Sequence, residues 1–160
     1  MSPRAAWRLE QLGFGETYNY VGSKMDWIGE CLPFEGTLAD RPRLSTLAET
    51  DVPTCELNET VAQVRGRLGG WELALVVTGP ARVVVGLVRA EALGLEDARQ
   101  IATVMQEGPS TYRPHVTAAE LSPKLEKRPV PWVVVTTLSG RLLGVARPEA
   151  VHAAAKADRG

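Results

Sequence analysis

Histidine and cysteine are scarce in this chain of 160 residues, which contains two of each. The cysteines, Cys31 and Cys55, form no Cys-x-x-Cys motif and have no histidine nearby in the sequence, so a zinc site is not expected. A chain of this size needs no disulfide, which favours two free thiols over a Cys31–Cys55 bridge. No Ser/His/Asp set, paired carboxylates or glycine-rich phosphate loop is present. The sequence therefore predicts a protein that is not an enzyme and has no catalytic or metal-binding residues.

The chain also lacks a charge imbalance and a long apolar run. Its formal net charge is −1, so a general attraction to nucleic acid is not expected. No apolar stretch approaches the roughly 18 residues of a membrane span, and the N-terminus lacks the pattern of a secretory signal. These absences predict a cytoplasmic protein without a membrane partner.

A duplicated stretch dominates the sequence. Residues 75–93 and 133–151 each contain an apolar run, a short turn, a second apolar run with a glycine, and then an arginine followed by an acid. Three residues recur at a constant offset of 58: Gly86, Arg89 and Glu91 match Gly144, Arg147 and Glu149. One unit of this length rarely closes its own core, so the two copies are expected to pack as a pair.

The first copy covers residues 51–105. It predicts an extended entry, a helix that Asn58 caps, and a hairpin of residues 73–78 and 82–88 around a Gly-Pro turn. Gly86 indicates a bulge or a close backbone approach. A second helix over 92–105 follows and is expected to break at Gly94.

The second copy covers residues 106–155 in the same order. Thr117 and Glu120 match a capping box, and Pro123 predicts a kink or a restart of the helix that follows. Residues 132–137 and 141–146 predict the second hairpin, and Pro148 predicts the start of the last helix.

The remaining segments lie outside the repeat. Residues 1–36 predict a helix ending at Gly13, a strand over 17–21 and a helix over 24–28. Their many aromatic side chains must pack on the rest of the chain or on a second subunit. Residues 37–50 are expected to be a linker lying along the surface, and residues 156–160 a tail.

The doubled β-α-β-β-α order resembles a pair of CBS domains, or Bateman module. The resemblance covers residues 51–152 and implies an α+β fold in which two repeats pack about a pseudo-two-fold axis, here after an N-terminal helical and extended segment. It also implies a homodimer, a regulatory role without catalysis, and adenosine-containing ligands bound in the clefts between repeats. No cofactor is required.

The family's ligand signature, Gly-h-h-Thr/Ser-x-x-Asp with h apolar, is altered in both copies. Arg89 and Arg147 stand at the hydroxyl position, and alanine stands at the acid position. Each arginine either binds an anion near a helix start or forms a salt bridge to a nearby glutamate. Glu91 and Glu149 lie one residue early, and one helical step of about 100° keeps them from replacing the acid.

Five further positions are candidates for ligand contact. Thr54 and Thr111 lie at the extended entries, where each either contacts a ligand or bonds its own backbone. Cys55 is a small residue near the expected cleft and is either a redox sensor or inert packing. Tyr112 and Arg113 either stack on and clamp a ligand or belong to the core. His115 is expected to be exposed, and Trp71 and Trp132 are expected to pack between repeats or subunits.

Residues 1–36 resemble the C-terminal tail of a rhodanese-like domain, through Gly13-Phe14, the Gly22-Ser23-Lys24…Trp27 segment and the Leu32-Pro33 exit. Neither cysteine fits that family's Cys-x5-Arg pattern, so its catalytic loop is missing. Three hypotheses follow: a regulatory module that binds a small anionic or nucleotide-like ligand, a structural dimerisation module with empty clefts, and part of a sulfur-transfer system.

Overall fold

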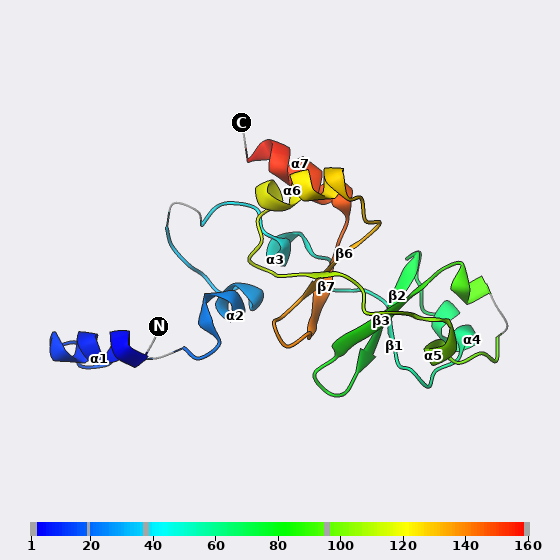
Figure 1. The fold of residues 1–160 in the computed structure, drawn as a ribbon, viewed down its shortest axis with the longest axis horizontal. Helices are drawn as coiled ribbons and strands as arrows, with labels where there is room; N and C mark the ends of the chain where they lie inside the picture. Colours follow the sequence, from blue (N-terminus) through cyan, green and yellow to red (C-terminus); the bar gives the residue numbers. More distant parts are fainter. Residues whose placement is uncertain (1–2, 19, 37–38, 95–96, 159–160) are drawn as a thin grey trace.

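Two similar α+β units follow an N-terminal extension (Figure 1). The structure is a computed structural model that describes residues 3–18, 20–36, 39–94 and 97–158. Its helices are α1 (Pro3–Gln11), α2 (Ser23–Gly29), α3 (Leu44–Leu47), α4 (Val61–Arg65), the 3-10 helix η1 (Ala92–Gly94), α5 (Ile101–Val104), α6 (Ala118–Lys127) and α7 (Pro148–Ala157). Its strands are β1 (Thr54–Cys55), β2 (Leu73–Thr78), β3 (Val83–Arg89), β4 (Gln106–Glu107), β5 (Thr111–Tyr112), β6 (Val133–Thr136) and β7 (Leu142–Ala146).

The two sheets have matching topologies. In the first sheet the order is β1-β2-β3-β4, with β1 parallel to β2 and the other neighbours antiparallel. In the second sheet the order is β5-β6-β7, again with a parallel first pair and an antiparallel hairpin. The predicted α+β fold and both predicted hairpins are therefore confirmed.

Each unit buries an apolar cluster beneath its helices. The first unit packs α4, η1 and α5 on its sheet around Val61, Val64 and Ile101. The second unit packs α6 and α7 together on its sheet, around Leu121, Leu125 and Val151 (Figure 1). Helical spacing of these apolar side chains explains why each helix presents one face to the sheet.

The segment just before β1 packs on the second unit, and the segment just before β5 packs on the first. The short helix α3 places Leu44, which is fully buried, in the core of the second unit, and Glu49 then forms an antiparallel bridge with Val145 of β7. The helix α5 and strand β4 do the same on the first unit, where Gln106 pairs with Leu87. The buried side chain of Leu44 therefore holds this segment against the second unit. Leu38, which was expected to help hold the segment along the surface, lies outside the described residues.

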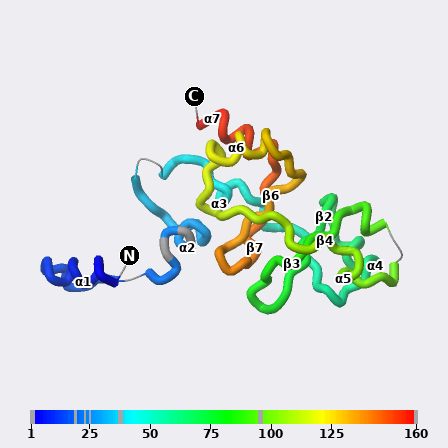
Figure 2. The backbone as a smooth tube through the Cα atoms, viewed as in Figure 1, coloured from blue at the N-terminus to red at the C-terminus, as the bar shows by residue number. Residues whose placement is uncertain are grey.

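These pairings make Glu49 and Gln106 equivalent positions. Val145 and Leu87 occupy the same place in their hairpins, one residue after Gly144 and Gly86, and each pairs with the preceding segment. The tube in Figure 2 shows the second such segment running from β4 beside β3 across to α6. The equivalence decides the chemistry of the site described below.

Several helix boundaries in the structure differ from those predicted. The cap of α4 is Thr60 rather than Asn58, because Thr60 and Gln63 form a capping box. The capping box of Thr117 and Glu120 is confirmed, and Pro123 lies inside α6, which neither ends nor restarts there. The helix predicted over 92–105, with a break at Gly94, is η1, which ends at Gly94, and α5, separated by a stretch that includes undescribed residues 95–96.

The two units meet through their sheets. Apolar side chains from both sheets form one cluster: Val52, Leu73, Leu75, Val77, Val134, Leu142 and Val145. At the hairpins, the amide of Val84 donates to the Gly140 carbonyl over 3.0 Å, and the amide of Leu142 donates to the Arg82 carbonyl over 3.1 Å. Val84 is equivalent to Leu142, and Arg82 is equivalent to Gly140, so each unit donates the same hydrogen bond to the other. This reciprocal pair is what a pseudo-two-fold axis produces.

The N-terminal extension lies largely apart from the two units (Figure 1). Helix α1 and helix α2 confirm the two predicted helices, whereas the predicted strand over 17–21 is wrong for its described residues. Tyr18 is 79% exposed and Val21 is 90% exposed, whereas Tyr20 packs edge-on against Trp27 of α2 with ring centroids 5.3 Å apart. Helix α2 does reach the second unit, where Glu30 forms an ion pair with Arg141.

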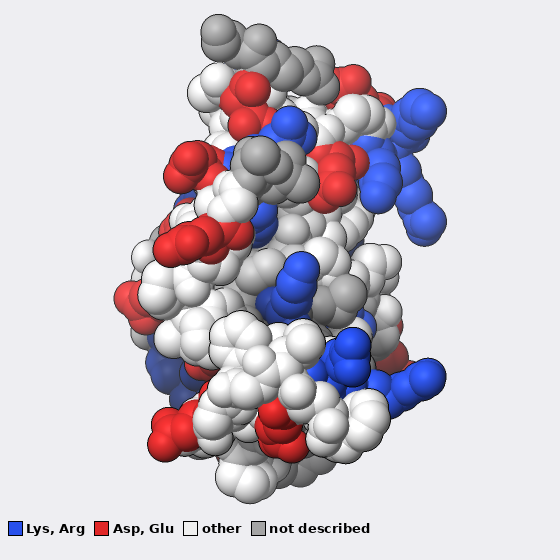
Figure 3. Space-filling model, turned by 90° about the vertical axis from the view of Figure 1, so that its left-hand side faces the viewer, with Lys and Arg blue, Asp and Glu red and all other residues white. Residues whose placement is uncertain are grey.

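The side of the molecule that carries α1 and α2 shows acidic and basic side chains together (Figure 3). Among the described residues, no helix has the length and apolar character that a membrane span requires.

Candidate functional site

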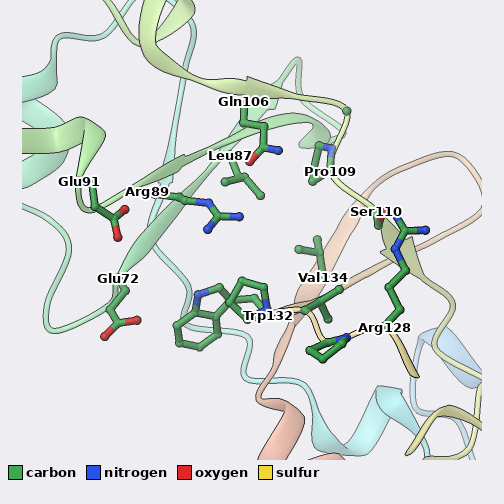
Figure 4. A pocket seen from close by; sticks show the side chains of 14 residues that line it. Glu72, Leu87, Arg89, Glu91, Gln106, Pro109, Ser110, Arg128, Trp132 and Val134 are labelled. Carbon is green, nitrogen blue, oxygen red and sulfur yellow. The ribbon is translucent and has the colours of Figure 1, made fainter. Parts of the chain in front are cut away.

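A pocket of about 470 Å³ opens where the two units meet. Its walls come from the end of β3, from the segment between β4 and β5, and from the loop between α6 and β6 (Figure 4). The lining residues are Glu72, Leu87, Arg89, Glu91, Gln106, Gly108, Pro109, Ser110, Arg128, Pro129, Val130, Pro131, Trp132 and Val134. A pocket of this size falls in the range of small-molecule sites.

Arg89 is the predicted site residue that lines this pocket. It ends β3, and its guanidinium points into the pocket (Figure 4). The side chain is exposed and forms no ion pair or hydrogen bond with any residue in the described part of the chain. An unpaired guanidinium offers five donors to an incoming anion.

Arg147 occupies the equivalent position in the second repeat but is already engaged. Its Nε donates to Oε1 of Glu49 over 3.1 Å. Its guanidinium also lies 5.4 Å from the ring centroid of Trp71 and 5.3 Å from that of Trp132. An ion pair and two cation–π contacts satisfy this arginine within the protein.

The difference between the two arginines has a simple cause. Glu49 supplies the carboxylate that pairs with Arg147, and the equivalent residue beside Arg89 is the uncharged Gln106. An amide oxygen attracts a guanidinium far less than a carboxylate does. The pseudo-symmetric fold therefore holds one neutralised and one available arginine.

A second arginine reaches the same pocket from the second unit. Arg128 is the C-cap of α6, and its backbone N–H donates to the Lys124 carbonyl over 2.9 Å. Pro129 and Pro131 follow directly and restrict the loop backbone. No described residue forms an ion pair or hydrogen bond with the Arg128 side chain.

Two carboxylates line the side of the pocket next to Arg89. Glu72 and Glu91 lie on that side in Figure 4, away from Arg128. Glu91 lines the pocket from a turn before η1 rather than from within a helix, and the expectation that it does not replace the missing acid stays a prediction. The helical step assumed for its side chain does not apply.

The other candidates from the sequence lie elsewhere. Thr54 and Thr111 sit in the short strands β1 and β5, paired with β2 and β6. Tyr112 packs against the core of the second unit, and the Arg113 guanidinium donates to the hydroxyl of Thr136 over 2.7 Å. None of these four is among the residues that line the pocket.

Cys55 is buried within the first core cluster. Its thiol donates to the Leu75 carbonyl over 3.8 Å, and burial raises its pKa to about 12, with a further increase from the nearby Glu59 carboxylate. A thiol in this state is a poor nucleophile. Both cysteines are free, as expected, and Cys31 is exposed.

Sequence reasoning missed most of the pocket wall. Arg128, Gln106 and Ser110 lie in the second copy but outside the stretch 133–151 that recurs most closely, and none of them was chosen as a candidate from the sequence. The Pro129–Trp132 loop carried a usable signal, since two prolines around one residue indicate a fixed loop.

Trp71 and Trp132 do pack between the repeats as expected, with ring centroids 5.5 Å apart. His115, by contrast, is only half exposed, and its Nδ1 is buried without a described partner.

The fold is that of a CBS-domain pair. The cystathionine beta-synthase pair domain of a putative Mg²⁺ transporter from Shewanella oneidensis matches with a TM-score of 0.63 at 14% identity, over 100% of this chain and 96% of that chain. CBSX2 in complex with AMP matches with a TM-score of 0.62 at 13% identity, over 74% and 99% of the two chains.

The cytosolic domain of the Mg²⁺ channel MgtE in complex with ATP matches with a TM-score of 0.60 at 15% identity. That match covers 71% of this chain, which spans only 50% of the channel domain's chain. No family model matches the sequence, and no curated protein matches it. At these identities the similarity establishes the fold alone.

Proposed function

We propose that this protein is a non-catalytic regulatory module that binds a small anionic ligand in the pocket between its two units. The observation that carries the proposal is Arg89, whose guanidinium points into a pocket of about 470 Å³ and pairs with none of the described residues. Adenine nucleotides are the leading candidates, because phosphate suits a guanidinium and Leu87, Trp132 and Val134 supply an apolar wall for a base.

Structures of similar fold support the choice of ligand class. One is described in complex with AMP and another in complex with ATP. The altered signature of this chain places an arginine where such proteins carry a hydroxyl, so we expect the phosphate to bind Arg89 directly. We infer that the module works as a homodimer in the cytoplasm, as the resemblance to CBS pairs implies.

The proposal also sets the number of ligands. Arg147 is held by Glu49, Trp71 and Trp132, so the equivalent position in the second repeat lacks an available cation. We therefore expect one ligand per chain. Isothermal titration calorimetry measures this number directly.

A thermal-shift screen with AMP, ADP, ATP and simple anions tests the proposal. A ligand at about 100 times its dissociation constant adds about 2.7 kcal/mol of stability. For a chain of this size that raises the melting temperature by roughly 5–10 °C. Arg89→Ala is expected to abolish the shift, whereas the matched variant Arg147→Ala is expected to melt earlier but keep the ligand-induced shift. No response to any ligand would remove the proposal.

A structural dimerisation module is the second candidate function. The contact between Arg147 and Glu49 favours it, since that position in the fold is occupied by the protein's own side chains. This alternative expects a stable dimer in size-exclusion chromatography with light scattering and no ligand response. A monomer would exclude it. The resemblance of residues 1–36 to a rhodanese tail stays a prediction, and the protonated Cys55 thiol gives sulfur transfer no support.

A further inference from the structure

The pocket holds two arginines, from different units, that pair with no residue in the described part of the chain. Arg89 projects from β3 of the first unit, and Arg128 projects from the end of α6 in the second unit. Figure 4 shows them entering from different walls, and Ser110 also lines the pocket. An anion that contacts both arginines would link the two units through charge-assisted hydrogen bonds.

We propose that Arg89 and Arg128 form a two-point clamp for a chain of two or more phosphate groups, so that this pocket distinguishes nucleotides by their number of phosphates. The inference rests on the proposed function and adds the ligand class and its recognition. It predicts that ATP binds more tightly than ADP, and ADP more tightly than AMP.

The chemistry of the two side chains supports a polyphosphate. Each guanidinium presents a planar fork of donors that matches the oxygens of one phosphate group. A single phosphate on one wall satisfies one fork and leaves the other arginine in water. A phosphate chain carries oxygens along its length and engages both forks at once.

The other charged residues of the pocket determine which way the bound phosphate chain of the ligand lies. Glu72 and Glu91 lie on the Arg89 side of the pocket, where their carboxylates repel phosphate. The phosphates are therefore expected to extend from Arg89 toward Arg128 and Ser110. The uncharged end of the ligand then lies near the two carboxylates, which accept hydrogen bonds from hydroxyl or amino groups.

The loop that carries Arg128 is suited to this role. The backbone N–H of Arg128 still bonds within α6, and Pro129 and Pro131 limit the conformations of the next residues. A loop restricted before binding loses less entropy when the ligand arrives. The side chain of Arg128 has no partner in the described part of the chain, so its replacement is expected to leave folding intact.

Calorimetric titration of the full chain with AMP, ADP, ATP and inorganic tripolyphosphate tests the clamp. Wild-type protein is expected to bind ATP about tenfold or more tightly than AMP, because one additional charge-assisted contact is worth at least that factor. Arg128→Gln is expected to remove most of this preference for ATP and to lower the affinity for tripolyphosphate. The affinity for AMP should change by less than about twofold. Lys127→Gln makes the same charge change at the neighbouring helix end, outside the pocket lining, and is the matched control.

The outcomes separate this inference from the proposed function. Equal affinities for AMP and ATP in the wild type would overturn the clamp and leave the proposed function standing. An equal loss of AMP and ATP affinity in Arg128→Gln, or an equal effect of Lys127→Gln, would also overturn it. If no nucleotide and no tripolyphosphate binds, the proposed function itself fails. Unchanged melting temperatures of both variants confirm that binding, not folding, is compared.

Discussion

Arg147 donates a hydrogen bond from its Nε to Oε1 of Glu49 over a distance of 3.1 Å, across the boundary between β7 and the segment that precedes the first repeat. The equivalent pair in the other half of the molecule is Arg89 and Gln106. Arg147 is therefore neutralised by the Glu49 carboxylate, whereas Arg89 stands beside an amide and stays available to a ligand. The asymmetry of the candidate site originates in a residue that lies outside the duplicated stretch.

Gln106→Glu is the first prediction that follows from this pair. The new carboxylate would stand beside Arg89 as Glu49 stands beside Arg147, compete with the ligand phosphate and repel it. We expect nucleotide affinity to fall about tenfold, which corresponds to about 1.4 kcal/mol. Isothermal titration calorimetry measures the change.

The matched control is Gln11→Glu, which adds the same charge at the end of α1, away from the pocket. It is expected to leave affinity unchanged. If Gln106→Glu binds nucleotide as tightly as the wild type, the role assigned to Arg89 is incorrect.

The two repeat glycines provide a prediction about stability. A Cβ on Gly144 would lie 2.5 Å from the backbone oxygen of Glu49, whereas a Cβ on Gly86 would first meet the Met105 sulfur at 2.8 Å. A flexible methionine can move aside, but the bridged backbone at Glu49 cannot. We expect Gly86→Ala to cost about 1–3 kcal/mol and Gly144→Ala to cost more. Urea unfolding monitored by circular dichroism gives both values, and the reverse order would contradict the packing described here.

The capping box of α6 predicts a dependence of stability on pH. The Glu120 carboxylate accepts hydrogen bonds from the Thr117 amide and hydroxyl over 3.0 and 2.9 Å, and these hold the pKa of Glu120 below its ordinary value. Because the folded pKa is lowered, this stabilisation is complete above the unfolded value of about 4.3 and is lost as pH falls through the folded pKa.

Glu120→Gln isolates that contribution, since Gln63 fills the same place beside Thr60 without a charge. The wild type is expected to exceed this variant in stability by less than about 1 kcal/mol near pH 7, because the group is exposed. The difference should vanish at low pH. Urea midpoints measured from pH 7 to pH 3 check this, and a difference that is constant with pH would refute it.

The two thiols are expected to react at very different rates. Cys31 is exposed, whereas Cys55 is buried and its pKa is raised to about 12. At pH 8 a thiol reagent should therefore modify one cysteine per folded chain, and the second only after denaturation. Mass spectrometry of the labelled peptides identifies the site. Rapid labelling of Cys55 in the folded protein would show that the first core opens readily.

The hairpins and the capping box of Thr117 and Glu120 could be predicted because their signals are local. An apolar run, a glycine turn and a second apolar run specify a hairpin within about twenty residues. The helix expected over 92–105 was right in its break at Gly94, where η1 ends, but wrong in its extent. The second helical piece is only Ile101–Val104, because tertiary packing recruits Ile101 to the core through a separate short helix.

The candidate site was predictable only in part. Arg89 was chosen as a candidate because it recurs in both copies, but the sequence offered no reason to distinguish it from Arg147 as an anion-binding residue. Thr54, Thr111, Tyr112 and Arg113 were drawn from segments near the expected clefts. None of them lines the pocket, and their contact with a ligand stays a prediction.

The sequence by itself determined the duplication, the α+β character and the identity of the repeated arginines, because these depend on residue order and short-range periodicity. Only the tertiary structure decided which arginine is available. The carboxylate of Glu49 and the amide of Gln106 reach the arginines through strand pairing between segments distant in sequence. Arg128 joins Arg89 because two separately folded units meet at that pocket. No local pattern encodes these proximities, since each arises from packing that brings remote segments together.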